Sequence, residues 1–465
     1  MSEFVKSVTV KGLHGQFDFS CDFEEGVNII YGKNGTGKTT LLHIIANVLN
    51  RDFMRFLALD FKQITVEFSK GDSITIDLEK ISTMAKHFHY NLRVNGEKIN
   101  KREFCPLNPD VLFGKENGQM DGEDDEDMDF ALTHKPDIAL SSAYFPAFRT
   151  AIDAWAITQE DNPKVARRYR LRKNESPKTE FARSLFGQFV PRLDYPATSE
   201  IEFDLNEKIG TAIANVSKSD RINFVNVPSK ILEALSSSEE NINPDSIFQD
   251  IEKLSKKLQD YPIQVESISS NLGASIRSLP EDGDSRRVAQ LVLSAYKEAL
   301  NKIVEVQEAS FYEIERYLKS VNIFLENKSL EISQMLLPPS RQSLFRGSNS
   351  PSVVVRFEGE NSRPTSMSQS LSSGERQIVT LIYATTKMSK QDVILVDEPE
   401  ISLNVDWQRK LLPEMVNQMP SKQLIVCTHS PIIGAKYREK MIELKSTQTV
   451  SSDDEQLDFK MFDIE

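Results

Sequence analysis

The segment GKNGTGKT, residues 32–39, constrains the fold of this chain more than any other feature, because it matches the pattern G-x-x-x-x-G-K-[ST]. The run GVNIIYG that leads into it is short, continuous and apolar, as in a buried strand. The run TTLLHIIANVL that follows repeats apolar residues at helical spacing. A strand, a glycine-rich loop and a helix in this order predict a loop whose backbone N–H groups converge on phosphate oxygens, assisted by the partial positive charge of the helix N-terminus.

The residues of this loop have distinct expected roles toward a nucleoside triphosphate. Lys38 should reach the β- and γ-phosphates, and the Thr39 hydroxyl should ligate Mg²⁺. We expect further contacts to the nucleotide from Gly32, Asn34, Gly35, Gly37 and Thr40. The loop therefore predicts ATP and Mg²⁺ as ligands and ATP hydrolysis as the candidate reaction.

A second group of candidate residues follows two apolar runs in the C-terminal part of the chain. In VILVDEPE, residues 393–400, Asp397 is placed to hold the Mg²⁺ shell and Glu398 to polarise an attacking water. In KQLIVCTHS, His429 follows the next run and could contact the γ-phosphate or order the water. Because α/β sheets bind ligands at the carboxyl ends of their strands, we expect Glu398 and His429 to act with Lys38 as catalytic residues.

Strand and helix patterns divide the chain into three expected regions. Alternating and continuous apolar runs predict strands in the first part, with a hairpin that turns at Lys70–Asp72 and a further strand that stops at Pro146. Strand and helix patterns alternate again in the last part, which predicts a mostly parallel sheet with helices on both faces. We therefore expect an α/β head made of residues 1–150 and 331–465, with an N-terminal antiparallel β-lobe, and a helical insertion at residues 151–330.

The expected insertion contains two runs with apolar residues spaced alternately by three and four positions, which is the spacing of a coiled-coil seam. The second run predicts a helix that begins near Asp284 and continues for about 40 residues, or roughly 60 Å. We interpret the region as a helical hairpin or small bundle that forms a structural arm. The seam residues are Ile247, Ile251, Leu254, Leu258, Tyr261, Phe311, Ile314, Leu318, Val321 and Leu325.

The formal net charge of −13 argues against wholesale wrapping of nucleic acid, because phosphate binding needs clustered cations. The basic run KVARRYRLRK, residues 164–173, keeps two interpretations open: a surface for nucleic acid or an acidic protein, and a solvated helix face. The acidic run DGEDDEDMD, residues 121–129, is typical of a loose surface loop. Three dispersed cysteines, the lack of an apolar run long enough to span a bilayer and the lack of a signal-peptide pattern predict a cytoplasmic protein without a membrane contact.

The ordered motifs GKNGTGKT, LSSGERQ, VILVDEPE, SLN and THSP resemble the head of ABC-type ATPases, over residues 1–100 and 340–445 approximately. The resemblance implies that LSSGERQ, residues 371–377, is the signature segment that approaches the γ-phosphate held by another subunit. The signature residues that it implies at the nucleotide are Ser372, Ser373, Gly374 and Glu375. It also implies that the chain pairs with itself as a head-to-tail dimer, or as a higher multiple such as a hexamer.

Within this superfamily, DEPEISLNVDWQRKLL and the segment Tyr-Phe-Pro-x-x-Arg ending at Arg149 resemble the branch that contains the OLD nucleases and RecF. We expect no room for a Toprim domain after His429, so the resemblance points to stand-alone ATPase subunits of two-gene anti-phage systems: AriA-type ATPases of PARIS first, and PtuA-type ATPases of Septu next. It implies a partner effector nuclease, Toprim-type first, and a phage protein as trigger. The alternative is a RecF-like or SMC-like DNA-repair ATPase that binds DNA through residues 164–173.

Two residues keep alternative interpretations. Arg149 either lies near the nucleotide or forms a structural salt bridge. Asn404 stands where family members often carry histidine, and it either belongs to a loop across a subunit interface or caps the helix that follows. The nucleotide-binding subunit of a transporter is a weaker hypothesis, since such subunits lack a helical insertion of this length.

Overall fold

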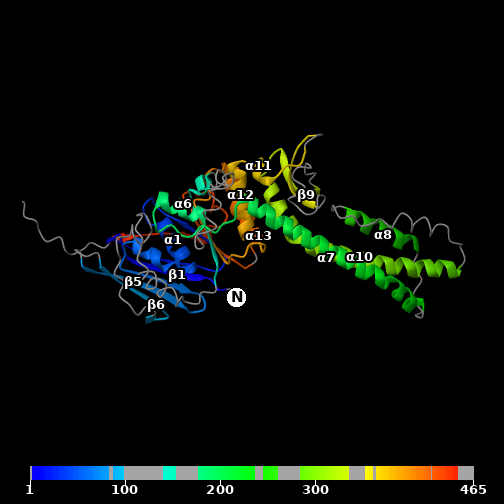
Figure 1. Ribbon diagram of the computed structural model, residues 1–465, viewed down its shortest axis with the longest axis horizontal. Helices are drawn as coiled ribbons and strands as arrows, with labels where there is room; N and C mark the ends of the chain where they lie inside the picture. The colour runs from blue at the N-terminus through cyan, green and yellow to red at the C-terminus, as the bar shows by residue number, and fades with distance from the viewer. Residues whose placement is uncertain are drawn as a thin grey trace, which may run out of the picture. The chain divides into compact units, whose positions relative to one another are not determined.

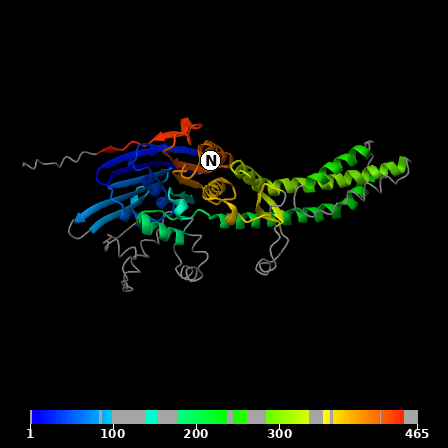
Figure 2. The same cartoon turned by 90° about the horizontal axis from the view of Figure 1, so that it is seen from above.

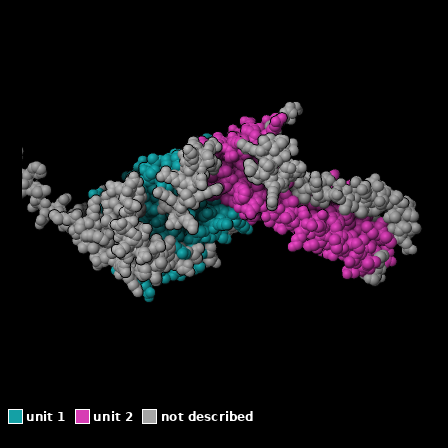
Figure 3. Space-filling model, viewed as in Figure 1, with its two compact units in different colours: residues 1–195, 384–465 teal, residues 196–383 magenta. Residues whose placement is uncertain are grey.

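The computed structural model (Figure 1) describes residues 3–82, 87–98, 140–152, 155, 176–235, 244–259, 283–334, 351–359, 363–419 and 421–448. The chain forms two compact units, coloured separately in Figure 3, and each is described by itself. The first unit comprises residues 1–195 and 384–465, and the second comprises residues 196–383. The acidic run 121–129 and the basic run 164–173 lie outside the described residues.

The N-terminal part of the first unit forms an antiparallel sheet, as its alternating apolar pattern predicts. In the described residues the strand order is β14-β2-β1-β4-β5-β6-β7. The connection from β4 to β5 turns at Gly71, whose φ of +99° favours glycine, so the turn expected at Lys70–Asp72 is confirmed. The strands are β1 (Val5–Leu13), β2 (Phe17–Asp22), β4 (Gln63–Phe68), β5 (Ser73–Ser82), β6 (His87–Val94), β7 (Glu97–Lys98) and β14 (Thr447–Gln448).

The second sheet of this unit is parallel, with the order β13-β3-β12-β11-β8 in the described residues. Every residue of β11 and β12 is buried, which explains why these strands are continuous apolar runs. The expected combination of a parallel sheet with an antiparallel β-lobe is confirmed. The strands are β3 (Val27–Tyr31), β8 (Ser142–Phe145), β11 (Val393–Asp397), β12 (Gln423–Cys427) and β13 (Met441–Glu443).

The helix after the glycine-rich loop, α1 (Lys38–Leu49), packs against β8, β11 and β12. Its apolar residues are buried, and the helix begins after Gly37, whose φ is +91°. The register of the parallel sheet pairs Asp397 with Cys427 and Cys427 with Ile30. The loop before α1, the turn after β11 and the turn after β12 therefore emerge at the same edge of the sheet.

Other helices of the first unit are α6 and α13, and short 3-10 helices connect some of its elements. Asn404 caps α13, because its Oδ1 accepts the N–H of Trp407 at 2.8 Å, so the capping interpretation of Asn404 is confirmed. The bounds are η1 (Phe53–Ala58), α6 (Pro177–Phe186), α13 (Val405–Gln418) and η2 (Arg438–Lys440).

Long helices dominate the second unit. Helix α10 (Gly283–Asn322) packs along α7 (Thr198–Leu235) and α8 (Pro244–Gln259), and Figures 1 and 2 show the three side by side. The helix expected from about Asp284 is therefore present with the expected length. The seam interpretation is wrong at Leu325, since α10 ends at Asn322 and the chain turns there. Among the helices that the structure describes, none is long and apolar enough to cross a membrane.

The second unit also contains a two-stranded antiparallel ribbon of β9 (Lys328–Gln334) and β10 (Pro351–Phe357), together with α11 (Met367–Ser370) and α12 (Ser373–Thr385). Helix α7 is bonded to these elements, because Asn206 Oδ1 accepts the N–H of Val353 at 2.8 Å and Glu202 Oε2 accepts the N–H of Met367 at 3.0 Å. Tyr317 of α10 donates a hydrogen bond to the backbone oxygen of Val379 in α12 at 3.0 Å. The helix that carries the LSSGERQ segment is thus anchored to the long helices of its own unit.

Candidate functional site

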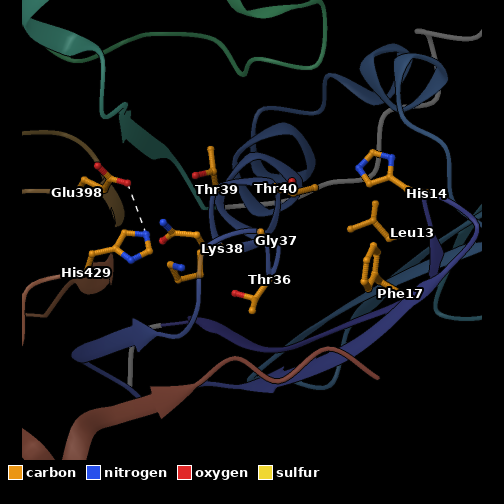
Figure 4. Close-up of a pocket in the computed structure, with 12 residues that line it drawn as sticks. Leu13, His14, Phe17, Thr36, Gly37, Lys38, Thr39, Thr40, Glu398 and His429 are labelled. Carbon is orange, nitrogen blue, oxygen red and sulfur yellow. Dashed lines mark ion pairs between the residues drawn. The ribbon is translucent and has the colours of Figure 1, made fainter. Parts of the chain in front are cut away.

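A cavity of about 720 Å³ lies over the glycine-rich loop of the first unit. Figure 4 shows Glu398 and His429 on one side, Lys38 and Thr39 near the middle, and Phe17 on the other side. The cavity therefore has a charged end beside the parallel sheet and an apolar end beside the β-lobe. Its lining residues are Leu13, His14, Phe17, Asn34, Gly35, Thr36, Gly37, Lys38, Thr39, Thr40, Glu398 and His429.

The loop itself has the backbone that a phosphate cradle requires. Gly35 and Gly37 have φ values of +79° and +91°, which L side chains rarely adopt. At Gly32 an added Cβ would lie 3.0 Å from the backbone oxygen of Leu444. Lys38 is buried, and its Nζ donates to the backbone oxygens of Gly32 at 3.0 Å and of residue 33 at 2.9 Å. Burial lowers the pKa of the Lys38 ammonium.

Thr39 lines the charged end of the cavity, and the buried Asp397 is its hydrogen-bond partner. The Thr39 hydroxyl donates to Asp397 Oδ2 at 2.9 Å. Asp397 is buried, and this burial raises the pKa of its carboxyl to about 6, against the opposing effect of the Thr39 hydrogen bond. A hydroxyl and a carboxylate oxygen are ligands that suit Mg²⁺, so this pair fits the cation that the loop implies.

Glu398 and His429 face each other across the charged end. His429 Nε2 lies 3.6 Å from Glu398 Oε1, and both side chains are about one-third exposed, at 37% and 33%. Figure 4 marks this ion pair with a dashed line. The pair is therefore open to solvent and available to a water or phosphate oxygen, unlike the buried Asp397.

The backbone beside His429 is organised by Glu400, which the sequence reasoning did not assign to the site. Glu400 Oε1 accepts hydrogen bonds from the Thr428 hydroxyl at 2.8 Å, the His429 N–H at 2.8 Å and the Ser430 N–H at 3.0 Å. Three donors on one carboxylate oxygen fix the turn that carries His429. Glu400 belongs to the DEPE motif, but its hydrogen-bond partners lie in the turn that follows β12. No pattern near Glu400 in the sequence therefore indicates these bonds.

The sequence reasoning also missed Leu13, His14 and Phe17. They belong to β1, β2 and the turn that joins these strands, and they line the end of the cavity opposite Glu398 and His429 (Figure 4). The alternating pattern of the β-lobe predicts the strands but carries no indication that their connecting turn reaches the loop. Aromatic and apolar side chains here could contact the base of a nucleotide.

Arg149 is buried, and its guanidinium donates to backbone oxygens of the turn that follows β11. The two interpretations of Arg149 from the sequence are a position near the nucleotide and a structural salt bridge. The hydrogen bonds to backbone oxygens add a third function, since they connect Arg149 to the residues that carry the carboxylates.

The signature segment belongs to the second unit, whereas every residue that lines the cavity belongs to the first. Ser372 and Ser373 are exposed at the start of α12, and Gly374 is buried. Glu375 Oε2 accepts the N–H of Ser372 at 2.6 Å and a hydrogen bond from Lys328 Nζ at 2.8 Å. The segment is thus a capped helix start that presents two serine hydroxyls to solvent.

Together, the two sheets, the glycine-rich loop and the charged pocket define a P-loop ATPase. The family described as AAA ATPase domain matches residues 4–433, and the chain belongs to this family. ATP hydrolysis is accordingly the activity of the family, and it implies a bound nucleotide. A search of curated proteins found no match.

Solved Smc head domains are similar over nearly the whole chain. One is the Smc head domain with an extended coiled coil bound to the C-terminal domain of ScpA, derived from Pyrococcus furiosus, with 12% identity, a TM-score of 0.39 and coverage of 96% of each chain. Another is the Smc head domain with a coiled coil and joint derived from Pyrococcus yayanosii, with 14% identity, a TM-score of 0.35 and coverage of 96% of this chain and 97% of that chain. The bound ScpA domain is a feature of the first of these structures.

Proposed function

We propose that this ATPase is the sensor and scaffold subunit of a two-component anti-phage defence system, in which paired heads control a partner effector nuclease. The observation that carries the proposal is that its chemical groups belong to two different units. The cavity of the first unit gathers Lys38, Thr39, Glu398 and His429, while the exposed serines of the signature segment lie in the other unit. Such a division suits a site that two copies of the chain complete together.

In this proposal the residues at and beside the charged end of the cavity have distinct tasks. The Thr39 hydroxyl and the Asp397 carboxylate would hold Mg²⁺, which when bound neutralises phosphate charge. The Glu398 carboxylate orients the attacking water and accepts its proton. Lys38 and His429 donate to the transferring phosphoryl group and stabilise the charge that develops on it.

The signature segment supplies the remaining contacts from the second copy. The Ser372 and Ser373 hydroxyls stand at the N-terminus of α12, where the helix dipole favours an anion. The γ-phosphate held by Lys38 of one copy would meet these hydroxyls of the other. Because α12 is bonded to α10 through Tyr317, closure of the pair could be transmitted to the long helices, which would carry the signal to the effector.

Mixing two inactive variants tests the shared site. Lys38→Ala removes the phosphate lysine, and Ser372→Arg blocks the signature of the same chain. In a mixed dimer, one site receives both lesions and the other receives none, so ATPase activity should return to a measurable fraction of the wild-type rate. If the two variants associate and no activity returns, the shared site is wrong.

A matched control uses two lesions on the same half of the site. Lys38→Ala mixed with Glu398→Gln places one lesion in each site of the dimer, so no activity should return. Recovery in this control would mean that Lys38 and Glu398 of one site come from different chains, and it would overturn their placement on the same half. Association is measured in all mixtures by light scattering after gel filtration with ATP.

The effector part of the proposal is tested in cells that carry the chain with its neighbouring gene. We expect co-purification with a nuclease, Toprim-type first, and loss of protection against phage in the Lys38→Ala variant. A phage protein that restores nuclease activity in vitro would be the trigger. Steeply salt-dependent DNA binding by the isolated chain, without a nuclease partner, would instead support the DNA-repair alternative.

A further inference from the structure

Glu398 has a backbone conformation that few side-chain-bearing residues adopt. Its φ is +46°, in the left-handed region, and Pro399 follows it directly. A residue held in this region is strained, and the conformation persists only where the surroundings enforce it. The N–H of Glu398 donates to the backbone oxygen of Cys427 at 2.8 Å, which fixes the entry to the turn. This bond does not involve the backbone carbonyl oxygens of the turn, which require hydrogen-bond donors from elsewhere.

Arg149 supplies these donors from the helical turn that follows β8. Its Nη1 donates to the backbone oxygens of Pro146 at 2.9 Å and Asp397 at 3.0 Å. Its Nη2 donates to those of Glu398 at 3.2 Å and Pro399 at 3.4 Å. Arg149 is only 2% exposed, so these bonds form away from water. One guanidinium therefore joins three consecutive carbonyls of the turn to its own segment.

The chemistry of these contacts requires arginine. A guanidinium presents its N–H donors in a rigid planar fork, whereas a lysine ammonium is a single centre that cannot span the same set of carbonyls. The segment that carries Arg149 is anchored beside it, because Phe148 stacks on Phe186 of α6 with ring centroids 3.8 Å apart and planes 16° from parallel. The fork is thus held on a fixed support.

We propose that Arg149 is a positioning residue for ATP hydrolysis: it holds residues 397–399 in the turn that presents the Glu398 carboxylate to the attacking water. This inference rests on the proposed role of Glu398. Asp397 is already fixed by its ladder pairing with Cys427, whereas Glu398 lies just beyond the ladder. Loss of Arg149 should therefore misplace Glu398 more than it disturbs the groups that bind nucleotide.

The test compares Arg149→Lys with a matched control, Arg183→Lys. Arg183 is also buried in the first unit, at 3% exposure, and it donates to Val190 O at 2.8 Å and Asp52 Oδ2 at 2.9 Å. Arg149→Lys should lower kcat roughly 10- to 100-fold, with a Kd for Mg-ATP within about threefold of wild type. Arg183→Lys should lower thermal stability and leave kcat per folded molecule within about twofold of wild type.

Two further variants keep the test decisive if Arg149→Lys folds poorly. Phe148→Leu weakens the stack on Phe186 and keeps the guanidinium, so it should give a smaller loss of kcat with the fold intact. Arg149→Ala should regain part of its kcat when millimolar ethylguanidinium is added, and ethylammonium should not restore it. Rescue by the planar cation alone would identify the fork, rather than positive charge, as the active feature.

The outcomes separate this inference from the proposed function. If the Arg149 variants keep the wild-type kcat while Glu398→Gln is inactive, the positioning role is wrong and the hydrolytic site stands. Equal losses of kcat in Arg149→Lys and Arg183→Lys would show a general packing role and also overturn the inference. If Glu398→Gln hydrolyses ATP as fast as wild type, the proposed role of Glu398 fails, and the inference fails with it.

Discussion

Thr39 and Asp397 are separated by 358 positions in the sequence and joined by a hydrogen bond of 2.9 Å from hydroxyl to carboxylate. Thr39 lies in the helix that follows strand β3, and Asp397 is the last residue of strand β11. In the sheet, β12 lies between these two strands. Their contact therefore depends on the pairing of β3, β12 and β11 in the parallel sheet. Burial raises the pKa of Asp397 to about 6, so the pair combines a buried acid with a hydroxyl that orients it toward the glycine-rich loop.

The first prediction concerns the charge of Asp397. Asp397→Asn keeps an acceptor for the Thr39 hydroxyl and removes the negative charge. We expect Mg²⁺ to lose most of its effect on ATP affinity, and kcat to fall at least about 100-fold, because a bound divalent cation is worth several kcal/mol in the transition state. ATP titration calorimetry with and without Mg²⁺ measures the first effect, and a phosphate-release assay measures the second.

The control for this variant is Asp392→Asn, just before the other end of β11. Asp392 Oδ2 accepts hydrogen bonds from the Ser141 N–H at 2.9 Å and the Ser141 hydroxyl at 2.7 Å, away from the cavity. The Asp392→Asn variant should leave the effect of Mg²⁺ on ATP affinity unchanged. An unaltered Mg²⁺ effect in Asp397→Asn would mean that another group holds the cation.

The second prediction concerns Glu400. Glu400→Ala leaves the Thr428 hydroxyl and the His429 and Ser430 N–H groups without their shared acceptor. We expect the free energy of unfolding to fall by about 2 kcal/mol and kcat to fall roughly 10-fold, because the turn that carries His429 loosens. Glu400→Gln retains an acceptor and should recover most of both losses. Equal kcat values for wild type and Glu400→Ala would show that the turn keeps its shape without this carboxylate.

The third prediction concerns Phe17 at the apolar end of the cavity. If the base of ATP lies on this ring, Phe17→Ala should raise KM roughly 5- to 150-fold with little change in kcat, because stacking of a base on an aromatic ring is worth about 1–3 kcal/mol. Gln16→Ala, in the exposed turn beside it, is the control and should leave KM unchanged. Competition experiments with ATP and with inorganic triphosphate show whether Phe17 contacts the base. Phe17→Ala should weaken the binding of ATP and leave the binding of triphosphate unaffected.

The sequence predicted the parallel sheet and the charged end of the cavity because both depend on local patterns. Lys38 and Thr39 belong to one eight-residue motif, and Asp397 and His429 each follow a continuous apolar run that could only be a buried strand. Parallel strands place their carboxyl ends at one edge, so these residues had to meet there.

The features that the sequence missed or assigned incorrectly depend on contacts without local patterns. Phe17 reaches the cavity only because of how the β1–β2 turn folds, and an aromatic residue in an alternating strand has no distinguishing mark. Arg149 binds backbone oxygens, which every residue possesses, so no partner could be inferred from residue types. Leu325 continued an apolar spacing beyond Asn322, where the helix had already ended.

The last prediction concerns His43, which is buried within α1 and bonded through Nε2 to the Tyr144 hydroxyl at 2.8 Å. Burial lowers the pKa of His43 to about 3, from an ordinary value of 6.5. The unfolded chain therefore takes up this proton at a higher pH than the folded chain does. Stability from the neutral imidazole is fully present above pH 6.5 and is lost as the pH falls toward 3, by about 1.4 kcal/mol per pH unit.

His43→Gln removes the titrating group and keeps a polar side chain of similar length. We expect the free energy of unfolding to decrease less steeply between pH 6.5 and pH 5 than in wild type, by a total difference of about 2 kcal/mol. Tyr144→Phe is the control, because it removes the hydroxyl partner but leaves His43 buried, so its stability should be lower with the wild-type slope. Urea unfolding at several pH values measures these slopes, and equal slopes in wild type and His43→Gln would mean that His43 does not contribute to acid sensitivity.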